Sequence, residues 1–147
     1  MKPILCLILL LMFLPLCAGR AEETDFMTLT GLGEMFARID AGESVVSASY
    51  SDNAYEQEDN DFTTCDTAEI DAILRSLKLI RVVRRSDEFR TDWYPLLQLT
   101  LSDGSVYALR FDWEWLEVEG VNYELEDADE FWGTIDDIAT KHHYAGE

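Results

Sequence analysis

The chain has 147 residues, of which 30 are acidic and 11 are basic, giving a formal net charge of −19 at pH 7. This length suits one domain. The negative charge argues against nucleic acid and anionic membrane surfaces as partners, because both repel an acidic protein. It is compatible with binding to cations or basic partners, and also with solubility alone.

Residues 1–21 have the pattern of a secretory signal peptide. Lys2 supplies a positive charge, residues 4–16 are apolar apart from one proline, and small residues follow. The apolar run is too short for a comfortable transmembrane span. We expect cleavage after Ala21, which leaves a mature chain from Glu22 with nine basic and 30 acidic residues and a net charge of −21. Such a protein would be secreted or lie at the exterior of the cell envelope.

A second interpretation of the leader is lipidation at Cys17. Residues 14–17 resemble a bacterial lipobox, although Leu16 stands where that motif normally has a small residue. Association with a membrane is expected only in this case. The mature chain keeps a single cysteine, Cys65, so it cannot form an internal disulfide. We expect a buried or capped thiol near a helix start, with pairing between chains as the alternative.

The first half of the mature chain predicts a helix followed by a strand. Residues 22–27 have the composition of a flexible lead-in. Apolar residues at helical spacing predict a helix over Thr30–Ala41, and Ser44–Tyr50 has the composition of a strand. The polar segment Asp52–Thr64 is predicted to be a loop.

A second helix and a second strand come next. Asp66, with Glu69 three residues later, has the pattern of a capping box at a helix start. The residue pattern then changes period, and Leu79–Arg84 is predicted to be a strand. Ser86–Asp92 is expected to connect it to the next element.

The stretch Pro95–Trp115 has the pattern of a β-hairpin, with two alternating runs around Ser102-Asp103-Gly104. A two-residue Asp-Gly loop would place Arg110 on the apolar face. A three-residue loop pairs Leu99 with Tyr107 and leaves that face wholly apolar, so we favour it. Four residues are expected to form the centre of the core: Leu97, Leu99, Leu109 and Phe111.

The last part of the chain predicts a further turn and a final helix. A turn at Glu119-Gly120 would continue the antiparallel meander. Asp127 and Glu130 resemble another capping box, and the tail from Tyr144 is expected to be loose. One face of the helix would carry Phe131, Ile135, Ile138 and His142.

These elements predict a single small α+β domain over residues 22–147. We expect a mainly antiparallel sheet of four to five strands, with two or three helices packed on one face.

Two tryptophans are candidate binding residues. Phe111, Trp113 and Trp115 would share one face of one strand, where they could pack beneath the helices. An exposed tryptophan could instead stack on a ligand or anchor a partner. Trp115, at the end of the row, is the one expected to escape burial.

A basic strip is the second candidate surface, because residues 75–90 hold six of the nine basic residues of the mature chain. Arg81, Arg84 and Arg85 could bind an anion or a partner. Alternatively, they pair with neighbouring acidic strands, which is the interpretation that we favour.

We expect no metal, no cofactor and no catalytic residue. The acidic segment 52–61 lacks the central glycine and the closing glutamate of a calcium loop. Adjacent His142 and His143 cannot chelate one ion as an i, i+4 pair can. Asp112 and Glu114 alternate with the core face and are expected to point to solvent.

Two functions follow from this pattern. The favoured one is an exported, acidic, non-catalytic module that binds a protein or a small ligand. The alternative is a small secreted hydrolase that uses carboxylates beside exposed tryptophans. Two carboxylates in one concave pocket beside an exposed aromatic side chain would favour the hydrolase.

Overall fold

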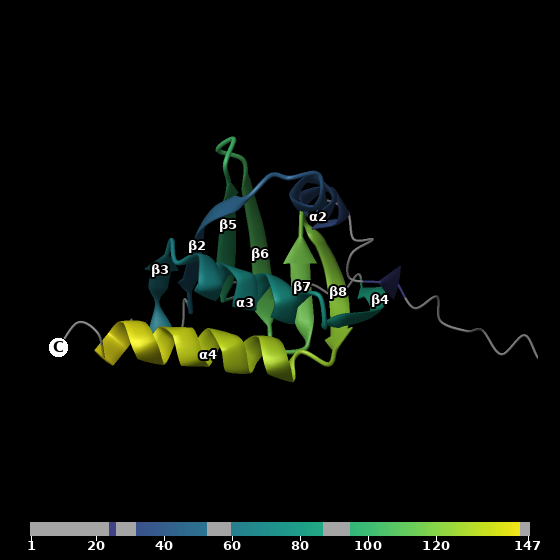
Figure 1. The fold of residues 1–147 in the computed structure, drawn as a ribbon. Coiled ribbons are helices and arrows are strands. Elements are labelled where there is room, and N and C mark those ends of the chain that lie inside the picture. Colours follow the sequence, from purple (N-terminus) through teal and green to yellow (C-terminus); the bar gives the residue numbers. More distant parts are fainter. Residues whose placement is uncertain (1–23, 26–31, 53–59, 87–94, 145–147) are drawn as a thin grey trace, which may run out of the picture.

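A computed structural model describes residues 24–25, 32–52, 60–86 and 95–144. These residues form three helices and one antiparallel sheet, which confirms the α+β class (Figure 1). The predicted signal peptide and Cys17 lie outside the described residues. None of the helices in the described ranges combines the length and the apolar character needed to cross a membrane.

The helices are α2 (Leu32–Asp40), α3 (Thr67–Leu77) and α4 (Asp129–Tyr144). The strands are β1 (Thr24–Asp25), β2 (Val45–Ser51), β3 (Phe62–Thr64), β4 (Arg81–Ser86), β5 (Leu96–Leu101), β6 (Val106–Asp112), β7 (Trp115–Val118) and β8 (Val121–Glu126).

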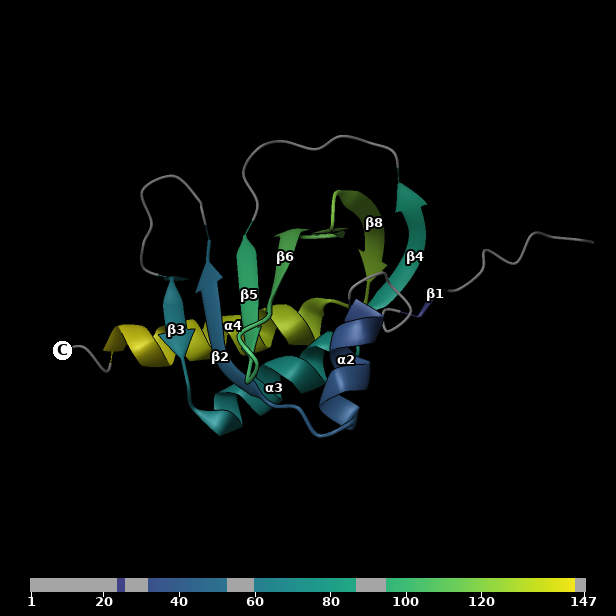
Figure 2. The same ribbon diagram turned by 90° about the horizontal axis from the view of Figure 1, so that it is seen from above.

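The sheet has eight strands in the order β1-β4-β8-β7-β6-β5-β2-β3, so the expected four to five was too few. Strands β5 to β8 form a meander of sequential neighbours. Helix α3 carries the chain across the sheet from β3 at one end to β4 near the other (Figure 2). The pattern did not indicate three of the strands, because β1 lies in the expected lead-in, β3 lies in the expected loop, and β6 was expected to continue through the start of β7.

The register of the central hairpin is confirmed. Leu99 pairs with Tyr107, and Leu97 pairs with Leu109. The Leu101 N–H donates to the Ser105 carbonyl at 2.9 Å, which closes the three-residue loop. Gly104 has φ +88°, the left-handed conformation that this loop requires.

The predicted turn at Glu119-Gly120 is also confirmed. Val118 pairs with Val121 across it. Both loop residues have positive φ, +51° and +78°, as in the type I′ turns that suit two-residue hairpins.

The prediction of one strand running to Trp115 is wrong. Strand β6 ends at Asp112, which pairs with Trp115 of β7. Trp113 and Glu114 therefore form a two-residue loop, and Trp113 has φ +45°. The chain reverses at this point instead of continuing along the core face.

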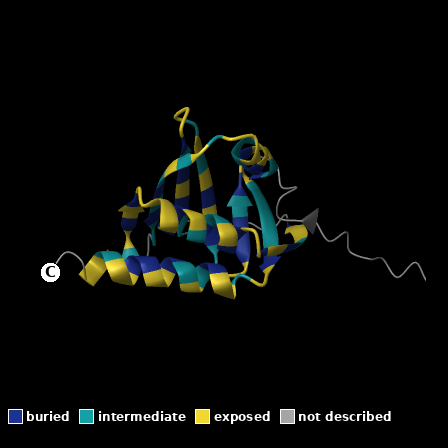
Figure 3. Cartoon of the chain, viewed as in Figure 1, coloured by how far each residue is buried: buried dark blue, intermediate teal, exposed yellow. Residues whose placement is uncertain are grey.

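The core lies between the sheet and the helices. Its four predicted central residues are each 0% exposed: Leu97, Leu99, Leu109 and Phe111. Helix α4 alternates buried and exposed residues along its length, as expected of an amphipathic helix on this core (Figure 3).

The expected packing of all helices on one face is not observed clearly. Helices α3 and α4 lie side by side, whereas α2 lies apart from them (Figures 1 and 2). Helix α2 still contributes to the core through buried Phe36, and the Lys78 ammonium after α3 lies 5.0 Å from the centre of its ring.

The two predicted helix caps differ in outcome. Asp66 caps α3, since its carboxylate accepts a hydrogen bond from the Ala68 N–H at 2.8 Å. The prediction that Asp127 caps the last helix is wrong, because α4 begins at Asp129 and Asp127 has φ +58°. An N-cap residue has extended backbone instead.

Candidate functional site

The structure reverses the expected solvent exposure of the two candidate tryptophans. Trp113 is 73% exposed, whereas Trp115 is 9% exposed. The cause is the tight turn, which removes Trp113 from the strand and returns Trp115 to the sheet beside Asp112. Trp113, rather than Trp115, is the aromatic side chain available to a ligand.

Trp132 of α4 holds this turn in place. Its indole Nε1 donates a hydrogen bond to the carbonyl oxygen of Trp113 at 3.3 Å. The two indole rings are tilted, with centres 5.6 Å apart. Behind them, the Trp132 ring makes edge contacts with Phe111 and Phe131 at 5.4 and 5.0 Å between centres. A continuous series of aromatic rings thus runs from the core to exposed Trp113.

Two cavities share Trp113 and Trp132, and we call them together the tryptophan cleft. The first has a volume of about 270 Å³. The other residues lining it are Tyr50, Asp52, Asn60, Pro95, Ile135, Asp136 and Ala139. The second has a volume of about 380 Å³. The other residues lining it are Glu114, Leu125, Glu126, Asp127, Ala128 and Asp129.

The cleft is acidic. Six of its lining residues carry carboxylates, and no Lys, Arg or His is among the described residues that line it. Burial first, and then the charges of Asp52 and Asp61, raise the pKa of the Tyr50 hydroxyl at its base. The same negative potential would favour a positively charged group.

Part of this charge is matched by a cation at the rim. Arg81 lies 3.8 Å from Glu126 and 3.5 Å from Asp127. Within the described part of the chain, Asp136 and Asp129 make no ion pair. The first cavity therefore retains an unpaired carboxylate, that of Asp136.

Among the described residues, two arginines of the basic strip pair with an acidic strand. Arg81 and Arg84 lie on β4 opposite Glu126 and Glu124 of β8, and both form ion pairs across the strands. Arg85 is exposed and lies opposite Tyr123. These contacts fit the favoured interpretation, in which the strip complements an acidic strand.

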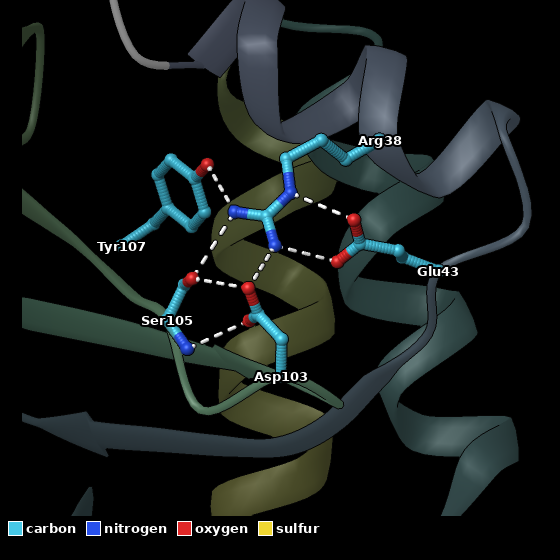
Figure 4. Close-up of polar contacts among 5 residues, drawn as sticks. All are labelled: Arg38, Glu43, Asp103, Ser105 and Tyr107. Atoms are coloured by element: carbon cyan, nitrogen blue, oxygen red, sulfur yellow. Dashed lines mark hydrogen bonds and ion pairs between the residues drawn. The ribbon is translucent and has the colours of Figure 1, made fainter.

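A second polar cluster surrounds Arg38 of α2 (Figure 4). Its guanidinium donates to both carboxylate oxygens of Glu43, at 3.0 and 2.6 Å. It also donates to Ser105 at 3.1 Å, to Tyr107 at 3.2 Å and to Asp103. A guanidinium has five N–H donors, and these contacts use all of them.

The Arg38 cluster is therefore structural. Its cation has no donor left for a ligand, and it fastens α2 to the loop of the central hairpin. Within that loop, hydrogen bonds from the Ser105 N–H and hydroxyl lower the pKa of Asp103 to about 2, with a further contribution from Arg38. Asp103 thus stays ionised and keeps the loop closed.

A third cluster joins the start of α3 to the end of α4. Glu69 is only 7% exposed. Its carboxylate accepts a hydrogen bond from Lys141 and lies 2.9 Å from Nε2 of His142. The His142 ring also stacks on Phe62, with centres 5.7 Å apart. The carboxylate lies in the first turn of α3 and the two basic side chains in the last turn of α4, so each group complements its helix dipole.

Glu69 does not complete the predicted capping box. The Asp66 N–H donates instead to the Thr64 hydroxyl at 3.0 Å, which frees Glu69 to contact α4. Burial alone would raise the pKa of Glu69, but hydrogen bonds from His142, Lys141 and Thr64 lower it to about 2. Since the ordinary value is 4.5, the folded state favours the ionised carboxylate.

We expect Glu69→Gln to destabilise the protein by about 1.5–3 kcal/mol at pH 7, the range for hydrogen bonds to charged groups. The pKa is lowered on folding, so this contribution is present above about pH 4.5 and is lost as the pH falls towards 2. Urea unfolding of both proteins between pH 7 and pH 2 measures the difference. A difference that stays constant over this range would contradict the assignment.

Among the described residues, the remaining candidates do not assemble into a site. Cys65 is exposed just before α3, so the thiol is not buried, which was one of the two forms expected. Within the described residues, no group of three or more His, Cys, Asp or Glu side chains could hold a metal ion. Much of the acidic segment, including Glu56, Glu58 and Asp59, lies outside those residues.

Comparison of the chain with protein-family models, with curated proteins and with solved structures found no match.

Proposed function

We propose that this protein is an exported, non-catalytic ligand-binding module whose binding site is the tryptophan cleft. The observation that carries the proposal is the position of Trp113, which is 73% exposed and lines both cavities. Ligand sites are concave and mostly apolar, with a few polar groups that fix orientation. The first cavity has this composition, since apolar side chains line it together with Asp52, Asn60 and Asp136.

The backbone at Trp113 gives independent support. A bulky residue at φ +45° is in the left-handed conformation, which costs roughly 1–2 kcal/mol for a residue with a side chain. Such strain persists where the surrounding structure enforces it, and it is concentrated at functional sites. Here, the hydrogen bond from Trp132 holds the strained turn and leaves the Trp113 indole exposed.

Binding without catalysis is favoured by the chemistry of the cavity walls. Among the described residues, neither cavity is lined by a His, Cys or Ser, so carboxylates are the groups left to act as a base or a nucleophile. Asp52 already accepts a hydrogen bond from the Asn60 side chain at 3.2 Å.

One observation favours the hydrolase as a second candidate function. Asp52 and Asp136 line the same cavity beside an exposed tryptophan, and glycoside hydrolysis uses two carboxylates as acid and base. In that case, Asp136→Asn would abolish turnover of a glycoside substrate. As a binding module, the protein would release no product from such substrates.

Export is part of the proposal and follows from residues 1–21. We expect protein recovered from outside the cytoplasm to begin at Glu22, and its intact mass tests this. A mass that includes Met1 would contradict export with cleavage, and a lipid adduct on Cys17 would favour membrane anchoring.

A fragment screen tests the site and requires no choice of ligand beforehand. The mature domain, labelled with ¹⁵N, is screened against a library of neutral, anionic and cationic fragments. We expect hits to shift the indole N–H signals of Trp113 and Trp132 more than that of Trp115. Fragments that bind only elsewhere on the domain would overturn the proposed site.

The matched variant is Trp113→Gly. Glycine accepts the positive φ, so the turn loses strain as it loses the ring contact with Trp132, worth about 0.5–1.5 kcal/mol. We expect stability within about 1 kcal/mol of the parent protein, since the two effects oppose each other. Fragment binding should nevertheless be lost.

A further inference from the structure

We propose that the tryptophan cleft binds an organic cation, an alkylammonium or guanidinium group, between its aromatic rings and the carboxylate of Asp136. This inference rests on the proposed function and adds the chemical class of the ligand. The charge of the cleft, its aromatic walls and its size support it.

All the charged side chains among the described residues that line the cleft are acidic. Its six carboxylates are Asp52, Glu114, Glu126, Asp127, Asp129 and Asp136, and no described lining residue is basic. Arg81 forms ion pairs with Glu126 and Asp127 of the second cavity. Its positive charge therefore offsets the negative charge of that cavity more than that of the first. A cation entering beside Asp136 would supply the missing counter-charge, whereas an anion would be repelled by Asp52 and Asp136.

The aromatic side chains that line the first cavity favour an organic cation over a metal ion. Tyr50, Trp113 and Trp132 all line the first cavity. Cations are attracted to the faces of such rings, and a set of rings around a cavity is the usual way to hold an ammonium group that carries apolar substituents. A metal ion would require several oxygen ligands converging on one point. Here, the apolar side chains of Pro95 and Ile135 also line the wall and would contact the substituents of an organic cation.

The volume of the first cavity, about 270 Å³, limits the size of the ligand. It lies just below the usual range of roughly 300–1,000 Å³ for sites that enclose a whole drug-sized ligand. The cavity therefore suits a head group. That group could belong to a free amine or to an Arg or Lys side chain of a basic protein, and the two sources share the same chemistry.

Two pairs of ligands of matched shape test the inference by titration of the ¹⁵N-labelled mature domain. Choline is compared with 3,3-dimethylbutan-1-ol, which replaces its nitrogen by carbon. Acetyl-arginine amide is compared with acetyl-citrulline amide, which removes the guanidinium charge. We expect one cation to shift the Trp113 and Trp132 indole signals and to bind at least about tenfold more tightly than its neutral partner.

Adjacent aspartates on α4 provide the matched variants. Asp136 lines the first cavity, and its neighbour Asp137 is also exposed but lines neither cavity. Both substitutions by asparagine remove one charge from the same helix. We expect Asp136→Asn to weaken cation binding at least about threefold at low salt and Asp137→Asn to leave it unchanged.

The outcomes separate this inference from the proposed function. If the neutral partners bind the cleft as tightly as the cations, or if both aspartate variants behave alike, the cation inference is wrong and the binding site stands. If neither these ligands nor any library fragment shifts the Trp113 signal, both proposals fail. Preference for choline identifies a free amine as the source, and preference for the arginine amide identifies a protein side chain.

Discussion

Phe111→Ala is expected to destabilise the domain by about 3–5 kcal/mol, the range for deletion of a buried aromatic ring. The Phe111 side chain is 0% exposed and stacks on Phe131 with 4.7 Å between ring centres. Alanine would leave a cavity between the sheet and α4, because neither element can collapse fully into the space. Urea unfolding followed by circular dichroism measures the loss.

The control for Phe111 is Val106→Ala on the same strand. Val106 is 55% exposed, so its truncation should change stability by less than about 0.5 kcal/mol. Because Phe111 also supports the ring of Trp132, the Phe111 variant should weaken ligand binding at the tryptophan cleft under conditions where it remains folded. A folded variant with unchanged binding would show that the aromatic series does not support the cleft.

Leu99→Ala is expected to destabilise the domain by about 2–5 kcal/mol. Leu99 is 0% exposed and lies on β5 between Ala48 of β2 and Tyr107 of β6. Its truncation therefore removes contacts at the middle of the sheet. Equilibrium unfolding in urea is again the measurement.

The neighbouring Gln98 provides the control for this change, since it lies on the opposite face of β5 and is exposed. Gln98→Ala should leave stability within about 0.5 kcal/mol of the parent protein. A loss well under 1 kcal/mol for Leu99→Ala would mean that the core lies on the other face.

The register of the central hairpin could be predicted because one face of the sheet is buried. A shift of one residue would have moved Arg110 into the core, and of the two loop lengths compared the three-residue loop avoids this. The same reasoning identified the core positions Leu97 and Leu109, because strand periodicity and burial point to the same residues. Local pattern was sufficient for the β5–β6 and β7–β8 hairpins.

The turn at Trp113 could not be predicted from its local sequence. Apolar alternation continues from Phe111 through Trp113 to Trp115, and neither loop residue is a Gly, Asn or Asp. Tryptophan favours strands and rarely adopts a positive φ. The turn is held by contacts with Trp132 of α4, which local propensity does not take into account. Propensity therefore predicted a continuous strand here, and it predicted that Trp115 would be exposed in place of Trp113.

Trp132, Glu69 and Arg38 were missed as organising residues for a related reason. Each contacts a segment far away in the sequence: Trp113, Lys141 and Ser105, respectively. Helical spacing identifies which face of a helix is apolar but not what lies opposite its polar residues. Those neighbours depend on how each helix is placed against the rest of the fold, which no local pattern encodes.

The outermost strands of the described sheet are short, and this affects how readily the protein aggregates at high concentration. At one end β1 spans two residues, and at the other β3 spans three. A long outer strand offers a row of unpaired backbone groups on which a second molecule can add a strand, and that addition is the first step of edge-to-edge aggregation. Here, each outer strand offers only a few such groups, and the chain's formal charge of −19 repels a second copy as it approaches. Both features disfavour addition of a second copy at these two outer strands.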